Sequence, residues 1–371
     1  MEATFEKALV KGFEKVDYLV SSLNGFPHIT KGGRWLENRN GHWTGGFWTG
    51  LLWLHYLETG EERFKEEALL RAGQLACRRN DNTTHDQGFI FGPSCIMGYN
   101  ITGNMELKKQ ALDGAGNMFD LYDRHVELIR AWAETDYERI AIVDTMMNLP
   151  ILLWAADQAN KKVYWELALS VIDVIQKYHI REDASTYHVV RWDESYRITG
   201  GTHQGYADET CWSRGQAWAF YGFANVYRYT GNAEYLEQAN QLARYYIDHL
   251  DADYQARWDF VFGDDTSQPV DSSAGAIAAS GLLLLAQLYK QMGNEKQYQY
   301  FKTNGEAIVR SLIEHCLYER TDCYGILEKA TVDLPRNSGI GESTMYGDYY
   351  FMEALYRIKY EDNEEKIALL Y

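Results

Sequence analysis

The sequence predicts an all-α protein, an (α/α)6 barrel or six-hairpin toroid, formed as one domain over residues 1–371. Two observations lead to this prediction. A turn signal built on Gly or Asn recurs along the chain, and the stretches before and after each turn differ in polarity. Helices that are apolar all round are buried, whereas helices with one polar face lie outside. Six helices of each kind close into a barrel, with long loops at its mouth.

The recurring turns carry residues that tolerate the left-handed conformation closing a helix, followed by a helix-forming stretch. They begin at Thr59, Thr102, Ala159, Thr230 and Met292. The spacing exceeds the roughly 33 to 47 residues of open helical solenoids, because long loops such as 180–213 intervene. The alternative is an irregular all-helical domain whose turns look alike only because helix caps look alike.

The expected helices follow from these turns. Apolar, aromatic or small-residue inner helices are expected at 46–57, 92–101, 141–158, 214–229, 272–291 and 347–359. Amphipathic outer helices are expected at 3–22, 61–79, 104–123, 161–178, 232–250 and 294–317. In a barrel of parallel inner helices, all the N-terminal ends meet at one mouth.

The composition narrows the classes of partner. The chain is 14% aromatic, with 11 Trp and 28 Tyr, which excludes a disordered protein. Its formal net charge of −17 argues against nucleic acid, since nucleic-acid binders usually carry a basic surface. Excess aromatic side chains favour a ligand with flat faces, for which carbohydrate is the leading candidate.

The sequence shows no targeting or cofactor-binding motif. The first residues lack the pattern of a signal peptide, and the longest apolar run, Ala274–Ala286, is too short to span a bilayer, so we expect a cytoplasmic protein without a membrane partner. The cysteines lack a Cys-x-x-Cys pair, which predicts reduced thiols. We expect neither a metal nor a nucleotide or other cofactor, because the motifs that hold them do not occur. The cysteines are Cys77, Cys95, Cys211, Cys316 and Cys323.

Polar and aromatic side chains gather where the inner helices are expected to begin. Loops held by a rigid frame are a common place for binding and catalytic groups, so this mouth is the candidate site. The segments are 40–48, 84–89, 143–150, 200–205, 211–218, 270–273 and 346–349.

Asp86 and Asp144 are the candidate pair for proton transfer. Asp144 lies within the apolar run 139–147, where burial and a neighbouring carboxylate both raise the pKa of a carboxyl group. Such a group can give and take a proton. The alternatives are a helix N-cap for Asp144 and a turn residue for Asp86.

The other candidates also have two interpretations. Arg214 either forms an ion pair with a buried acid or makes a bidentate contact with a substrate carboxylate. Trp43, Trp132 and Trp218 are core rings or platforms for sugar. His188, like His203, is a weak signal on its own, because a lone His is usually structural.

Several motifs, in order, resemble the unsaturated glucuronyl hydrolases of glycoside hydrolase family 88. The resemblance runs from about Trp35 to Leu355. The family has an (α/α)6 barrel, so the resemblance and the helix pattern agree on the fold. The motifs are Thr-His85-Asp86-Gln-Gly-Phe, Val-Asp144-x3-Asn148-Leu-Pro, Gly-Gly-Thr-His203-Gln204-Gly, Trp212-Ser-Arg214-Gly-Gln216-Ala-Trp218 and Gly347-Asp348-Tyr-Tyr.

This resemblance implies a glycosidase that releases the 4,5-unsaturated uronic acid from the non-reducing end of oligosaccharides made by lyases, such as glycosaminoglycan disaccharides. The implied reaction hydrates the C4=C5 bond, unlike the usual displacement between two carboxylates. It makes Asp144 the general acid/base and Asp86 the second essential carboxylate. The implied substrate-binding residues are Trp43, Trp132, His188, Gln204, Arg214 and Trp218.

Other functions remain open at this point. Unsaturated rhamnogalacturonyl hydrolases share the barrel and the chemistry, sugar 2-epimerases share the barrel, and a noncatalytic sugar-binding barrel is a third alternative. The source polysaccharide, its sulfation and the oligomeric state are not fixed by the sequence. Arg336, Ser338 and Ser343 either meet a sulfate group or cap the last inner helix.

Overall fold

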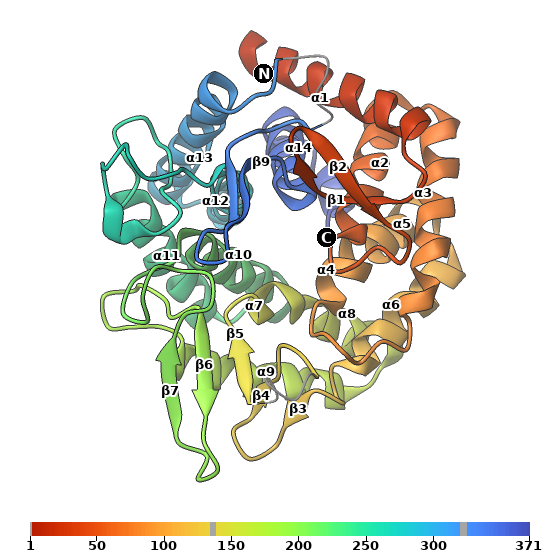
Figure 1. Cartoon of the computed structure of the whole chain (residues 1–371). Helices are drawn as coiled ribbons and strands as arrows, with labels where there is room; N and C mark the ends of the chain where they lie inside the picture. Colours follow the sequence, from red (N-terminus) through yellow and green to blue (C-terminus); the bar gives the residue numbers. More distant parts are fainter. Residues whose placement is uncertain (1, 134–138, 320–324) are drawn as a thin grey trace.

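A computed structural model describes residues 2–133, 139–319 and 325–371. Inner helices surround the centre of the molecule and a second set of helices lies outside them (Figure 1). The inner set comprises α2 (Gly45–Thr59), α4 and α5 (Gln87–Phe91, Met97–Thr102), α7 and α8 (Thr145–Asn148, Pro150–Ala159), α10 (Ser213–Thr230), α12 (Ser272–Gln291) and α14 (Met345–Lys359). The outer set comprises α1 (Ala3–Ser22), α3 (Glu62–Gln74), α6 (Met105–Asn117), α9 (Lys162–Tyr178), α11 (Ala233–Asp248) and α13 (Glu295–His315). The predicted (α/α)6 barrel is therefore confirmed.

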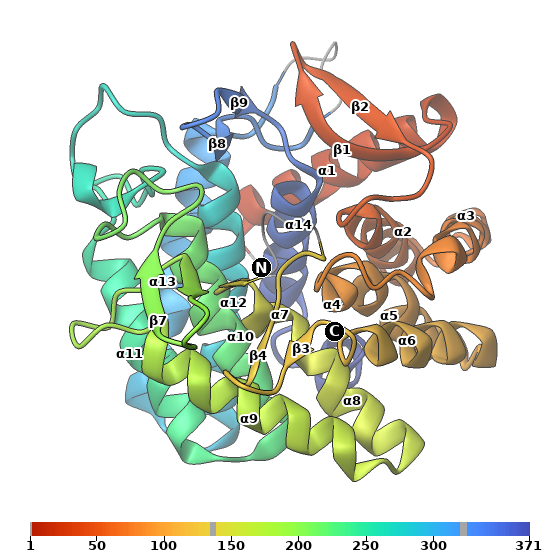
Figure 2. The same ribbon diagram turned by 60° about the horizontal axis from the view of Figure 1, so that its bottom comes forward.

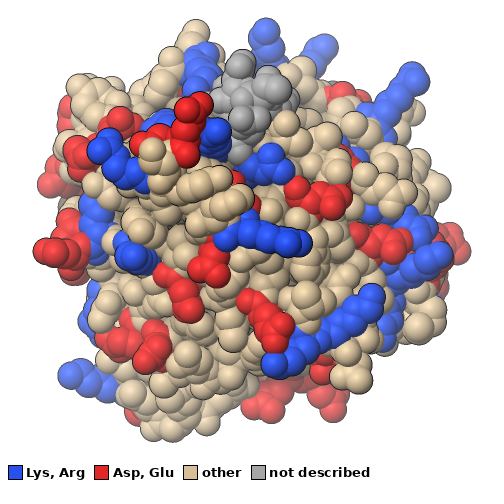
Figure 3. Space-filling view, turned by 90° about the horizontal axis from the view of Figure 1, so that it is seen from below, with Lys and Arg blue, Asp and Glu red and all other residues tan. Residues whose placement is uncertain are grey.

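The polarity of each set explains its place. Every side chain of α2 from Gly45 to His55 is buried, because this stretch is apolar or small on all sides. Helix α12 is long and apolar enough by composition to cross a membrane, yet 94% of its apolar stretch is buried inside the barrel. Helix α11 instead buries residues at helical spacing on one face only. Outward-facing charges of both signs are interspersed on the side of the molecule drawn in Figure 3.

The repeated turns have the expected backbone. Gly60, Gly103 and Gly231 end inner helices with φ between 64° and 70°, a region that favours glycine because it has no Cβ. Asn104 and Asn232 follow two of these turns and accept a hydrogen bond from the backbone N–H two residues later. Each hairpin thus ends one helix and starts the next within a few residues.

Three predicted boundaries were wrong. The helix expected at 141–158 begins only at Thr145, because Ile140–Ile142 forms strand β5; a short apolar run does not distinguish strand from helix by periodicity. The helix expected at 92–101 starts earlier, at Gln87, and passes through a π-helical segment containing Pro93, which has no N–H to donate. The helix expected at 104–123 ends at Asn117.

Short antiparallel strands, which were not predicted, extend the loops. The pair β1–β2 (Phe26–Lys31, Arg34–Asn38) and the pair β8–β9 (Ala330–Asp333, Ser338–Glu342) lie side by side at one end of the barrel (Figure 2). The region 180–213, expected as a loop, contains β6 (Val189–Trp192) and β7 (Ile198–Gly201), which form a three-stranded sheet with β5. A further pair is β3–β4 (Tyr122–Asp123, Leu128–Ile129).

Candidate active site

Asp144 lies at the junction of β5 and α7. It occupies the N-cap position of α7, as one interpretation expected, but its side chain makes no capping hydrogen bond and therefore does not cap the helix. The residue is 9% exposed, and within the described part of the chain its Oδ2 atom has no hydrogen-bond donor. Burial, helped by the charge of Asp86 and opposed by that of Arg214, raises the pKa of Asp144 to about 7. The carboxyl group can therefore hold a proton near neutral pH.

Asp86 lies directly before α4 and is also buried. Its Oδ2 atom accepts a hydrogen bond of 2.5 Å from the Thr84 hydroxyl, and its Oδ1 atom is 3.4 Å from His85 Nε2. Asp86 acts electrostatically on Asp144, so the two carboxyl groups lie near one another, and their roles in catalysis stay predictions. Their proximity favours one proton being retained at neutral pH, since like charges oppose the ionisation of both.

Two buried polar side chains join the segments that carry these aspartates. His85 is fully buried, and its Nδ1 atom is 2.9 Å from the hydroxyl of Thr145, next to Asp144. Asn148 accepts from the Phe89 N–H at 2.9 Å and donates to the Asp144 carbonyl at 3.2 Å. The start of α4 is thereby fixed against α7.

His188 reaches Asp144 from the strand side. Its Nδ1 atom accepts hydrogen bonds from the backbone N–H groups of His203 and Gln204, each at 3.2 Å. Nδ1 therefore carries no proton, and the proton of the neutral ring is on Nε2. Nε2 faces Asp144 Oδ2 at 3.7 Å. Burial holds the pKa of His188 well below its usual value, so the ring is neutral and its Nε2–H lies near the Asp144 carboxyl without a hydrogen bond to it.

Arg214, in the first turn of α10, forms the buried ion pair that was one of its two interpretations. Its partner is Asp271, and it also donates to the carbonyls of Thr331 at 2.8 Å and Val332 at 2.6 Å. The guanidinium lies over the Trp212 ring, 4.4 Å from the centroid. Arg214 therefore links α10 to strand β8 while its charge acts on Asp144; a direct contact with substrate stays a prediction.

The three candidate tryptophans occupy different environments. Trp43 is half-buried and stacks on Tyr346 with ring centroids 5.0 Å apart. Trp132 is half-buried, with its ring centroid 5.6 Å from that of His203. Trp218 is only 1% exposed and packs on Phe89, so in this structure it is a core ring. Contact of any of these rings with sugar stays a prediction.

Gln204 and the three residues considered for sulfate also have clear surroundings. The Gln204 side chain donates to the carbonyl of Val332 at 2.7 Å. Thr344 caps α14, so capping by Arg336, Ser338 or Ser343 is wrong. Ser343 is buried at 1% exposure and Ser338 is half-buried in β9.

Sequence reasoning did not select His85, Asn148 or Asp271 as site residues. All three stand in or next to motifs that point to the mouth, but their roles depend on partners far along the chain. Asp271, for example, caps α12 and also holds Arg214 and the Thr331 N–H. In the ranges that the structure describes, no group of three or more His, Cys, Asp or Glu side chains is arranged to hold a metal.

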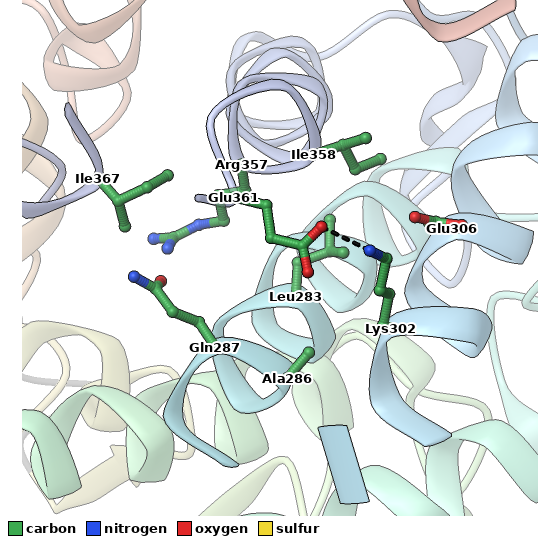
Figure 4. A pocket seen from close by; sticks show the side chains of 9 residues that line it. All are labelled: Leu283, Ala286, Gln287, Lys302, Glu306, Arg357, Ile358, Glu361 and Ile367. Atoms are coloured by element: carbon green, nitrogen blue, oxygen red, sulfur yellow. Dashed lines mark hydrogen bonds and ion pairs between the residues drawn. The ribbon is translucent and has the colours of Figure 1, made fainter. Parts of the chain in front are cut away.

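A separate small pocket lies between α12, α13 and α14, toward the ends of the inner helices opposite the mouth (Figure 4). Its charged groups are paired: Lys302 donates to Glu361 at 2.5 Å, and Arg357 donates to Glu353 at 2.9 Å. The pairing argues against proton-transfer chemistry there. The pocket is lined by Leu283, Ala286, Gln287, Lys302, Glu306, Arg357, Ile358, Glu361 and Ile367.

The chain is similar to known proteins of one family. Residues 22–308 match the sequence profile of Glycosyl Hydrolase Family 88. The chain is 33% identical to an unsaturated glucuronyl hydrolase of Bacillus sp. (strain GL1), over 90% of this chain and 91% of that protein. It is 32% identical to an unsaturated chondroitin disaccharide hydrolase of Streptococcus pneumoniae (strain ATCC BAA-255 / R6), over 87% and 83%.

Solved structures show the same relationship. The crystal structure of the unsaturated glucuronyl hydrolase from Bacillus sp. GL1 superposes with a TM-score of 0.91 at 31% identity, covering 96% of this chain and 97% of that one. An unsaturated glucuronyl hydrolase specific for heparin gives a TM-score of 0.91 at 29% identity, covering 98% and 99%. The chain therefore belongs to glycosyl hydrolase family 88.

Proposed function

We propose that this glycosidase releases the 4,5-unsaturated uronic acid from the non-reducing end of lyase-generated oligosaccharides by hydrating the C4=C5 bond. The observation that carries the proposal is the buried carboxyl of Asp144, with a pKa raised to about 7, beside Asp86 and facing the Nε2–H of His188. Protonating carbon needs an acid that still holds its proton near neutral pH, and this environment provides one.

The reaction follows from that arrangement. Asp144 transfers its proton to C4, and positive charge develops at C5, where the ring oxygen stabilises it. Water adds to C5 while the Asp144 carboxylate takes one of its protons. The resulting hemiketal opens as the bond between C5 and the ring oxygen breaks and the C5 hydroxyl proton passes to that oxygen, which leaves a ketone at C5 and a hydroxyl at C1. The hemiacetal at C1 then breaks its bond to the glycosidic oxygen, which takes the hydroxyl proton, so the remaining sugar leaves and C1 becomes an aldehyde. The Nε2–H of His188 and the charge of Arg214 stabilise the carboxylate that forms between the two proton transfers.

The partly exposed rings of Trp43 and Trp132 support a role as walls for the sugar rings. We propose that Gln204, Arg214 and Trp218 help to position the uronate. The buried charge of Arg214 attracts the substrate carboxylate only at short range, because salt screens charges over about 8 Å at physiological ionic strength.

The substrate within this class is tested with a panel of unsaturated disaccharides. Relatives are named for chondroitin disaccharides and for heparin, so the family divides among glycosaminoglycan sources. Turnover is followed by loss of the ultraviolet absorbance of the conjugated double bond. The panel contains unsaturated disaccharides from chondroitin, hyaluronan, heparin, gellan and rhamnogalacturonan. It therefore tests both the proposed glucuronyl hydrolase and the alternative, an unsaturated rhamnogalacturonyl hydrolase. If the protein consumes none of these disaccharides, the proposal is wrong. An epimerase would leave the absorbance unchanged.

We also propose that the protein works in the cytoplasm. Support comes from its thiols: Cys95, Cys211 and Cys316 are buried and free, and Cys77 is free and exposed. Cys323 lies outside the described residues. Cell fractionation tests this location, and the absence of nucleic-acid and membrane partners stays a prediction.

A further inference from the structure

Arg336 lies in the turn between β8 and β9, and its guanidinium is bound to the protein. Its Nη1 atom donates to the His203 carbonyl at 2.7 Å and to Asp333 Oδ2 at 2.9 Å. Its Nη2 atom lies 3.1 Å from His203 Nδ1, which accepts because an Arg nitrogen only donates. Arg336 thus holds both the main chain and the ring of His203, although its side chain is 49% exposed.

The segment that Arg336 holds is the one that fixes the tautomer of His188. The His203 and Gln204 N–H groups both donate to His188 Nδ1. Gly200, Gly201 and Gly205 surround this segment, and glycine leaves the backbone with more conformations to restrict than any other residue. The position of these two amides therefore depends on ties from outside the segment.

Hairpin β8–β9 supplies two such ties, one from Arg336 to His203 and one from the Val332 carbonyl to the Gln204 side chain. The same hairpin is anchored across the mouth, where Glu342 accepts from the Thr30 hydroxyl at 2.6 Å and the Gly32 N–H at 2.8 Å. A continuous path of contacts then runs from Arg336 through His203 and His188 to Asp144.

We propose that Arg336 is a positioning residue: it holds the amides of His203 and Gln204 over His188, so that His188 keeps its proton on Nε2, facing Asp144. Both Nη1 protons have protein acceptors, and one of the two Nη2 protons is directed at the His203 ring. The geometry is that of a clamp within the protein. The consequence for turnover rests on the proposed function, whereas the consequence for the His188 tautomer does not.

The test compares the wild type with Arg336→Ala and Arg336→Lys. Arg63→Ala is the matched control, because Arg63 is 52% exposed and also ion-paired, but lies on outer helix α3. Two quantities are measured: the ¹⁵N spectrum of the histidine rings, with His188 assigned through His188→Gln, and kcat and KM on an unsulfated and a sulfated unsaturated disaccharide. Melting temperatures establish that each variant is folded.

In Arg336→Ala we expect the His188 signal to change from a single Nε2–H tautomer to a mixture, and kcat to fall about tenfold on both substrates with little change in KM. Arg336→Lys keeps the charge on a single nitrogen but loses the fork of the guanidinium, so we expect its kcat and His188 spectrum to lie between those of the wild type and Arg336→Ala. It decides the question if the Ala variant does not fold. Arg63→Ala matches the wild type.

An unchanged His188 spectrum with unchanged kcat overturns the proposal. A rise in KM confined to the sulfated substrate also overturns it, and would instead make Arg336 an anion contact. If the wild type consumes no unsaturated disaccharide, the proposed function fails, while the ring spectrum still decides the role of Arg336.

Discussion

Activity should depend on pH through the proton on Asp144. With a pKa of about 7, this carboxyl is protonated in about ten of eleven molecules at pH 6 and in about one of eleven at pH 8. An ordinary Asp, with a pKa of 3.8, would hold its proton in only about one of 160 molecules at pH 6. Burial therefore increases the acid form more than about a hundredfold at that pH. We expect kcat/KM to fall about tenfold from pH 6 to pH 8.

Asp86→Asn tests the cause of this shift. It removes a negative charge that raises the pKa of Asp144, so the alkaline limb of the profile should move to lower pH, while burial, the larger cause, still raises the pKa above its ordinary value of 3.8. The assay records initial rates at substrate concentrations well below KM from pH 5 to pH 9. The position of the limb is the readout, because the height of the curve also reflects other roles of Asp86. A rate that is flat between pH 6 and 8, or a limb that moves upward, would refute the reasoning.

Three further predictions follow from the packing. Gly88→Ala should lower the melting temperature strongly, because the added Cβ would lie 2.6 Å from the Cα of Asn148. An unchanged melting temperature would show that α4 and α7 can move apart to make room for it. Trp43→Ala should raise KM more than it lowers kcat, and the reverse would contradict a role as a sugar wall. Burial raises the pKa of Asp348 to about 7. Between about pH 4 and pH 7 the folded protein therefore keeps a proton that the unfolded chain, with a carboxyl pKa of 3.8, has released. The free energy of unfolding should fall as the pH rises through this range. Asp348→Asn should make that slope shallower in thermal melts, and the remaining slope comes from other buried carboxyls such as Asp144 and Asp259. An unchanged slope would contradict the prediction.

The barrel was predictable because its helices are defined by local pattern. Helix α12 occupies the predicted residues 272–291, since a long apolar stretch between Asp271 and a Gly-containing turn has few other structures open to it. Strand β5 was missed because its pairing partner, β6, lies nearly fifty residues later, and a run of three apolar residues has no period of its own.

The candidate site shows the same division. Asp86 and Asp144 were predicted from their motifs, and the structure places them within electrostatic reach of one another. The tautomer of His188 depends on two amides of a glycine-rich segment, and the pairing of Arg214 depends on Asp271, 57 residues away in the chain. Such details arise from tertiary contacts that no local pattern encodes.

The central claim is that Asp144 supplies the proton, and Asp144→Asn tests it most directly. The amide keeps the shape of the side chain but cannot transfer a proton to carbon. Turnover of an unsaturated disaccharide should fall by at least about a hundredfold, with the fold retained. Arg63→Ala is the control, because this ion-paired side chain lies on outer helix α3, away from the mouth, and its loss should leave the turnover intact. Wild-type turnover by folded Asp144→Asn would contradict the account.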